Sequence, residues 1–95
     1  MTGIERLRLV RGHVPEAGRG VRRSLKLAAA EFEAAWRADA HDWPLKFRRS
    51  ADTIRSVLTR FGGTDETVDR LRPADVSQAV ASLRLFCDEA ERAIR

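Results

Sequence analysis

The sequence predicts an all-α fold, a small antiparallel helical bundle of three long helices plus one or two short helical turns. Apolar residues recur at spacings of three and four in three stretches, which places them on one helix face because 3.6 residues make a turn. Prolines and glycines separate these stretches. The alternation typical of a strand is nearly absent, with Leu7-Arg8-Leu9 as its one hint. We expect residues 1–95 to form a single domain.

The first long helix is expected over residues 16–40. Pro15 precedes it, and proline is tolerated in a first helical turn, whereas Gly18 and Gly20 weaken this beginning. Its apolar face would comprise Val21, Leu25, Ala28, Phe32 and Ala35.

The second and third long helices are expected near residues 43–61 and 74–94. Gly62 and Gly63 would end the second, since glycine adopts the left-handed conformation common after a helix, and Pro73 would begin the third. The second apolar face would comprise Phe47, Ala51, Ile54, Leu58 and Phe61. The third would comprise Val76, Ala79, Val80, Leu83, Phe86, Cys87, Ala90 and Ile94.

Two shorter elements complete the expected fold. Residues 64–72 form either a short helix or an ordered loop, with Thr64 as a candidate cap. Residues 3–11 add a fourth, shorter helix, in which Ile4, Leu7 and Val10 share one face.

The stretch AWRADAHDWPLKF, residues 35–47, contains both tryptophans and is interpreted as the corner between two helices. Asp42 is a plausible N-cap, Pro44 fits the first turn, and Trp43 would cover the end of the bundle. The alternative is a metal or acid–base site formed by Asp39, His41 and Asp42. Such a site needs further ligands from other helices, so we prefer the structural interpretation and expect no metal or cofactor.

The sequence offers little enzyme chemistry. Cys87 lies on the last apolar face without a histidine within a helical turn, so it is interpreted as a small buried side chain. Glu31 and Glu33 point to different helix faces, and no phosphate-binding glycine loop is present. We therefore expect a non-enzymatic protein.

One short pattern points the other way. Arg8 and His13 have an R-x4-H spacing, which resembles the motif of helical HEPN-type ribonucleases. That resemblance implies an arginine and a histidine acting together on RNA phosphate at a dimer face. It rests on two residues, at the start of the chain.

Positive charge is concentrated near the N-terminus. The formal net charge is +4, and residues 1–30 carry seven basic and two acidic residues. In an antiparallel hairpin the start of one helix approaches the end of the next, so a shared basic face is expected. This candidate face for nucleic acid or an acidic partner comprises Arg19, Arg22, Arg23, Lys26, Arg55 and Arg60.

Two segments resemble the helical core-binding domain of tyrosine recombinases. SADTIRSVLTRF (50–61) matches its polar-Thr-Ile/Leu-Arg helix, and LRPADVSQAVASL (71–83) matches its Leu-x-Pro-x-Asp-Val helix start. The resemblance implies DNA binding. The catalytic domain of that family is absent from this sequence.

The leading hypothesis is a small helical module that binds another protein or a second copy of itself. The alternative is a nucleic-acid-binding domain that uses the arginine-rich face. Residues 1–95 contain no apolar run of membrane-spanning length and no secretory signal, and the single cysteine excludes an internal disulfide, so we expect a cytoplasmic protein. We expect a charge at an exposed position of these apolar faces, such as Leu58→Asp, to disrupt self-association.

Overall fold

The computed structural model describes residues 3–14 and 21–93. Within these ranges the chain forms helices and connecting turns and no strand, which confirms the all-α prediction. The elements are α1 (Gly3–His13), α2 (Val21–Asp39), the short 3-10 helix η1 (Ala40–Asp42), α3 (Leu45–Leu58), α4 (Thr64–Arg70) and α5 (Pro73–Ala93).

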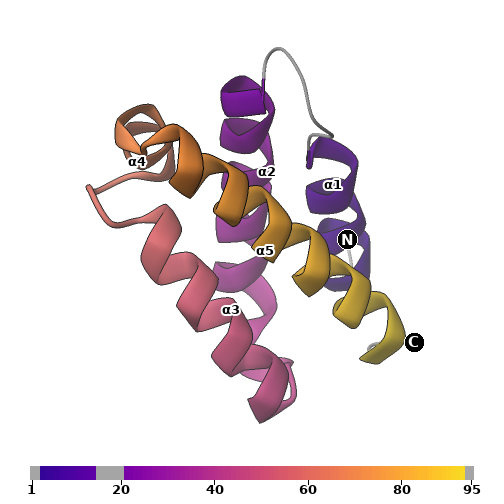
Figure 1. The fold of residues 1–95 in the computed structure, drawn as a ribbon. Helices are drawn as coiled ribbons and strands as arrows, with labels where there is room; N and C mark the ends of the chain where they lie inside the picture. The colour runs from indigo at the N-terminus through magenta and orange to yellow at the C-terminus, as the bar shows by residue number, and fades with distance from the viewer. Residues whose placement is uncertain (1–2, 15–20, 94–95) are drawn as a thin grey trace.

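The helices pack in two layers. α1 and α2 lie side by side and antiparallel, and α3 returns along the other side of α2 (Figure 1). α4 lies against the first part of α2, and α5 then runs obliquely across the front of the molecule, from α4 toward α1. The radius of gyration, 12.2 Å, agrees with the value of about 12 Å expected for a compact chain of this length.

α1 confirms the short helix expected over residues 3–11 and extends it to His13. Leu7 and Val10 are fully buried, as their shared face predicts, whereas the side chain of Ile4 lies outside the described part. An ion pair between Arg11 and Asp88 joins the end of α1 to α5. α1 is therefore an integral part of the core.

The corner between α2 and α3 differs in detail from the prediction. Asp42 is not an N-cap, because it belongs to η1 and Pro44 occupies the position before Leu45 without a side-chain cap. The proline disfavours helical geometry at the preceding residue, and Trp43 accordingly has ψ 145°. This extended residue separates Asp42 from the helix that it was expected to cap. Residues 16–20, which were expected to begin this helix, lie outside the described part.

Gly62 has the positive φ expected of it, 114°, but it does not end α3, because the helix already stops at Leu58 with Thr59 as its C-cap. Thr64 does not cap α4, since it is the first helical residue and Gly63 precedes it. Thr67 is buried, and its hydroxyl accepts a hydrogen bond from the Phe61 N–H at 3.1 Å. Phe61, predicted to join the apolar face of α3, lies in the turn and is 40% exposed.

Both tryptophans belong to an aromatic cluster that confirms the structural interpretation of residues 35–47. Trp43 contacts Trp36 edge-on, with ring centroids 6.2 Å apart, and Phe47 at 5.3 Å. Phe86 of α5 stacks on Phe47 at 4.3 Å and contacts Phe32 edge-on at 5.4 Å. These contacts connect α2, the corner, α3 and α5 in one core.

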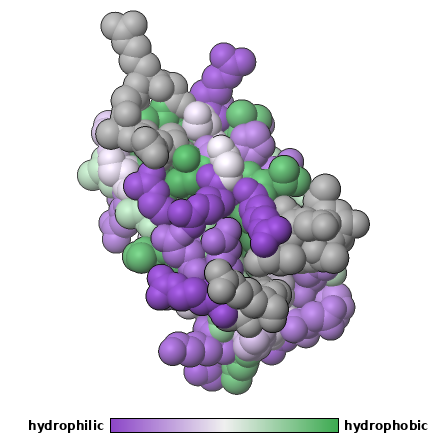
Figure 2. Space-filling model, turned by 90° about the vertical axis from the view of Figure 1, so that its right-hand side faces the viewer, coloured by the Kyte–Doolittle hydropathy of each residue, from purple (hydrophilic) through white to green (hydrophobic). Residues whose placement is uncertain are grey.

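The described residues on the face shown in Figure 2 are mostly polar. On the face turned toward the viewer in Figure 2, apolar side chains form small separate patches among charged ones wherever described residues are visible. Among the described residues, no helix is long and apolar enough to cross a membrane.

We predict that Phe86→Ala lowers the free energy of unfolding by about 3–5 kcal/mol, because it removes a buried ring that contacts three other aromatic side chains. Leu27→Ala is the matched control, since Leu27 is exposed on α2, and its effect should stay within about 0.5 kcal/mol. Chemical denaturation measures both. Equal effects of the two substitutions would contradict the central place of Phe86 in the core.

Candidate interaction groove

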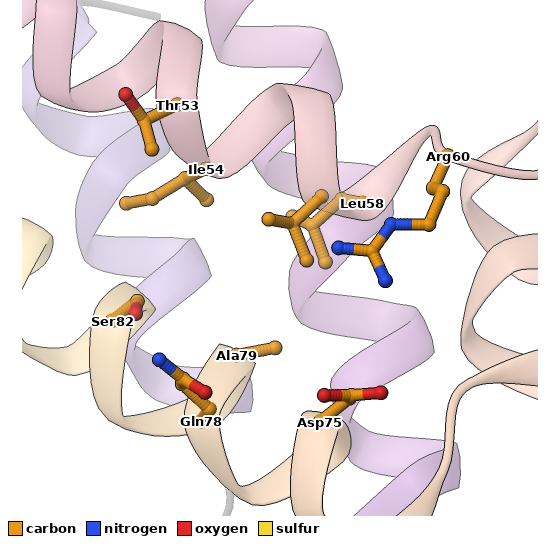
Figure 3. Close-up of a pocket in the computed structure, with 9 residues that line it drawn as sticks. Thr53, Ile54, Leu58, Arg60, Asp75, Gln78, Ala79 and Ser82 are labelled. Atoms are coloured by element: carbon orange, nitrogen blue, oxygen red, sulfur yellow. The ribbon is translucent and has the colours of Figure 1, made fainter.

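The surface is hollowed between α3 and α5, where a pocket of about 210 Å³ lies (Figure 3). Ile54, Val57 and Leu58 of α3 form one apolar wall, and Ala79 of α5 lies opposite. Polar groups border this apolar part: Thr53, Arg60, Asp75, Gln78 and Ser82.

The pocket is open because α5 presents short side chains to α3. Ala79 and Ser82 lie across the seam from the larger Ile54 (Figure 3), and Val57 lines the same pocket. Protein interiors are close-packed only where facing side chains fill the space. Val57 is half-buried and does not belong to the main core, unlike its neighbour Leu58. The wall of the pocket therefore includes apolar surface that the fold itself leaves unpaired.

The pocket continues in both directions along the seam. Toward the C-terminus of α5, a neighbouring hollow shares Thr53, Ile54 and Ser82 with it and adds Ser50, Leu85, Phe86 and Glu89. Toward α4, another hollow shares Arg60 and Asp75 and adds Phe61, Arg70, Leu71 and Arg72. We call the whole depression the α3/α5 groove. From Asp75 to Glu89 it follows α5 for about 21 Å, at 1.5 Å per residue.

The groove has a basic end, which we call the arginine end and define by Arg60, Arg70 and Arg72. These side chains, together with the partly exposed Phe61, line one hollow of about 330 Å³. None of the three guanidinium groups forms an ion pair or a hydrogen bond with another described residue. The positive charge of this end is therefore uncompensated by an ion pair within the described chain.

Part of the predicted basic face has a structural role. The Arg22 guanidinium donates hydrogen bonds to the backbone carbonyls of Val68 and, at 2.9 Å, of Leu71, where α4 ends. These carbonyls lack helical partners, so Arg22 satisfies them and joins α2 to α4. Lys26 forms an ion pair with Asp69 of α4 at 2.5 Å.

Arg55 is likewise engaged within the molecule. It donates two hydrogen bonds of 2.9 Å to the two carboxylate oxygens of Glu33, a bidentate arrangement, and lies 5.5 Å from the centre of the Trp36 ring. Arg37 donates a further bond of 3.1 Å to Glu33. The Arg55 bond holds the pKa of Glu33 below its usual value, against the opposing effect of burial, and Glu33 in turn raises the pKa of Arg55.

The remaining members of the predicted face are separated from this network. Arg19 lies outside the described residues. Arg23 is exposed on α2, and Arg60 is exposed at the groove. Sequence reasoning missed Arg70 and Arg72, for which the signal was the pair of arginines that flank the buried Leu71 just before Pro73.

The other candidate chemical groups do not converge in the described structure. His41 Nε2 lies 3.3 Å from Asp42 Oδ2, and both side chains are largely exposed. Among residues 3–14 and 21–93, no three histidine, cysteine or acidic side chains are grouped to hold a metal ion. Arg8 and His13 lie five residues apart on α1, which turns them about 140° from each other. Cys87 is buried as expected, and burial raises the pKa of its thiol to about 11.

Comparisons of the chain with protein-family models, with curated proteins and with solved structures found no match. The resemblance to recombinase core-binding domains therefore rests on residues 50–61 and 71–83 alone. In the structure these segments form α3 from Ser50 onward with its following turn, and the first half of α5, which are the two walls of the groove.

We predict that Glu33→Gln destabilises the protein at neutral pH by about 1–2 kcal/mol, since it weakens a bidentate, charge-assisted pair between α2 and α3. Because folding lowers the Glu33 pKa, its contribution is complete above the usual value of 4.5 and is lost as the pH falls through the lowered one. The difference between wild type and Glu33→Gln should therefore shrink in acid.

Denaturant unfolding at several pH values measures this difference. Glu89→Gln is the matched control, since Glu89 is an exposed carboxylate on α5. A difference between wild type and Glu33→Gln that is independent of pH down to strong acid would contradict the assigned role of the ion pair.

Proposed function

We propose that this protein is a small non-enzymatic interaction module that binds a protein partner, either another chain or a second copy of itself, in the α3/α5 groove. The observation that supports the proposal is the combination of an apolar wall with polar borders along a depression of about 21 Å. In this interpretation α2, α3 and α5 are the three long helices of an antiparallel bundle, and two of them form the binding surface.

The exposed side chains along the groove fit this role. Leu85 is 64% exposed at one end, and Phe61 is 40% exposed at the other. A partner that covers them removes apolar surface from water, at about 25 cal/mol per Å². A helix lying in a groove is a common way to bury such a strip. As part of the proposal, the protein needs no metal or cofactor and works in the cytoplasm, where the free thiol of Cys87 would remain reduced.

The second candidate function is nucleic-acid binding, and the arginine end supports it. Arg60, Arg70 and Arg72 line the same hollow as the exposed Phe61, and arginines combined with an aromatic side chain suit phosphates and a stacked base. Arg23 is the other described member of the predicted basic face that is exposed. Arg22, Lys26 and Arg55 would have to leave intramolecular partners to contribute.

The residue chosen to test self-association from sequence was wrong. Leu58 is 1% exposed and belongs to the core, so Leu58→Asp would unfold the protein and give no information on binding. Val57 is the suitable replacement, since it is half-buried, lines the groove and lies outside the main core.

We predict that peptides selected on the intact protein from a library of helix-forming sequences bind mainly in the groove. Val57→Asp should weaken their binding about tenfold or more, because it places a charge in the apolar wall. Ala81→Asp is the matched control, since Ala81 is exposed on α5 and does not line the groove, and it should leave binding unchanged. Fluorescence anisotropy measures the affinities.

The same variants test self-association, which sedimentation equilibrium detects as a mass of two chains. A dimer that Val57→Asp dissociates and Ala81→Asp preserves would make the second copy the partner. Selected peptides that are all indifferent to Val57→Asp, together with a monomer mass, would refute the proposal.

The nucleic-acid candidate predicts that the protein binds a labelled duplex of random sequence at about 50 mM salt and loses most of this binding at about 200 mM. Replacing Arg60 and Arg72 together by alanine should reduce the salt dependence, since two phosphate contacts disappear. Absence of binding at the lower salt concentration would refute this candidate.

A further inference from the structure

We infer that the partner of the α3/α5 groove is an amphipathic helix that carries a cluster of carboxylates at one end, and that these carboxylates bind the arginine end. The inference rests on the proposed function and specifies its partner. It depends on the position of the arginine end in the groove and on the absence of ion pairs between its arginines and other described residues.

The three residues of the arginine end come from three different segments of the chain. Arg60 comes from the turn after α3, Arg70 from the last turn of α4, and Arg72 from the link before α5. The Arg22 guanidinium adds a fourth positive charge at this corner, since it bonds to the carbonyl of Leu71, between Arg70 and Arg72. Like charges held together repel one another, so an anionic ligand is favoured here.

Asp75 is the one acidic side chain among the described residues that line this hollow. It lies in the first turn of α5, where it also faces the positive end of the helix dipole. It forms no ion pair with any of the three arginines. The arginine end keeps a net positive charge and retains donors for bidentate contacts with further carboxylates.

The arginine end and the apolar wall belong to one continuous surface. Arg60 and Asp75 line both the basic hollow and the central pocket. In Figure 3, Arg60 reaches in from the end of α3 beside Leu58, and Asp75 lies on the α5 side of the same end. A ligand that fills the central pocket with an apolar side chain thus brings its next residues to the arginines.

The charge along the groove is asymmetric. Apart from Arg60, no basic side chain is among the described residues that line the central pocket or the neighbouring hollow that contains Leu85. At that far end the groove is lined by Glu89. A uniformly charged strand of nucleic acid would find positive charge at one end only, whereas an amphipathic peptide with carboxylates at one end matches the whole groove. About 14 helical residues span its length.

The test is a selection of 14-residue peptides, from a helix-forming display library, on the intact protein and on a charge-reversed variant. The variant combines Arg60→Glu with Arg72→Glu, two exposed residues whose side chains form no ion pair within the described chain. The control combines Arg8→Glu with Arg92→Glu, which changes net charge equally on other exposed surfaces. Unfolding midpoints verify that both variants fold.

We expect peptides selected on the wild type to combine apolar residues at spacings of three and four with several carboxylates at one end. Their affinity should fall about tenfold or more on the charge-reversed variant and stay unchanged on the control. Peptides selected on the charge-reversed variant should carry lysine or arginine at the corresponding end.

Other outcomes overturn the inference in distinguishable ways. Neutral or basic peptides whose binding Val57→Asp abolishes would refute the acidic partner and leave the proposed function intact. If the protein is a monomer, and the selected peptides are all indifferent to Val57→Asp or no peptide is selected, both the acidic partner and the proposed function are refuted. A dimer that dissociates on Val57→Asp would assign the groove to a second copy. A duplex that displaces the peptides and depends on Arg60 and Arg72 would assign the arginine end to nucleic acid.

Discussion

The position of α5 depends on Phe86, and the groove depends on the position of α5. The Phe86 ring stacks on Phe47 of α3 and contacts Phe32 of α2 and Trp43 at the corner. This cluster holds the middle of α5 against both other long helices. Nearer its beginning, α5 presents Ala79 and Ser82 to α3, and these short side chains cannot fill the space that the bulky cluster sets. The position of α5 set by Phe86 therefore accounts both for the close packing around Phe86 and for the open space beside Ala79 and Ser82.

The network of polar contacts explains why so many arginines are compatible with a small core. Arg22 satisfies carbonyls at the end of α4, Arg55 pairs with Glu33 and lies over Trp36, and Arg11 pairs with Asp88. Each contact joins two different helices. The planar guanidinium suits these roles because it offers several donors in fixed directions. At the arginine end, by contrast, three guanidinium groups without such partners line a single hollow.

The sequence predicted the helical class and the apolar faces because both follow from local periodicity. The burial of Leu25, Phe32 and Leu83 agrees with their spacing of three and four. The exposure of Phe61 did not follow, since the helix stops at Leu58 and the chain turns under control of Gly62 and the buried Thr67. The spacing of apolar residues continues through this turn, so it does not indicate where the helix ends.

The groove and the arginine end could not be predicted in the same way. They arise where α5 crosses α3 and where α4 brings Arg70 beside Arg60, and crossing geometry is a property of the assembled core. The predicted basic face assumed a simple hairpin, which placed Arg22 and Arg55 together on the surface. The structure gives each of them a separate partner on a neighbouring element.

The most direct test of the account is to map the binding surface by nuclear magnetic resonance, with isotope-labelled protein and a peptide selected on the intact chain. The account predicts that amide shifts change along facing parts of α3 and α5, from the region of Asp75 to that of Glu89. Changes concentrated on α1 or on the outer face of α2, with α3 and α5 unaffected, would contradict the claim that the groove is the functional surface.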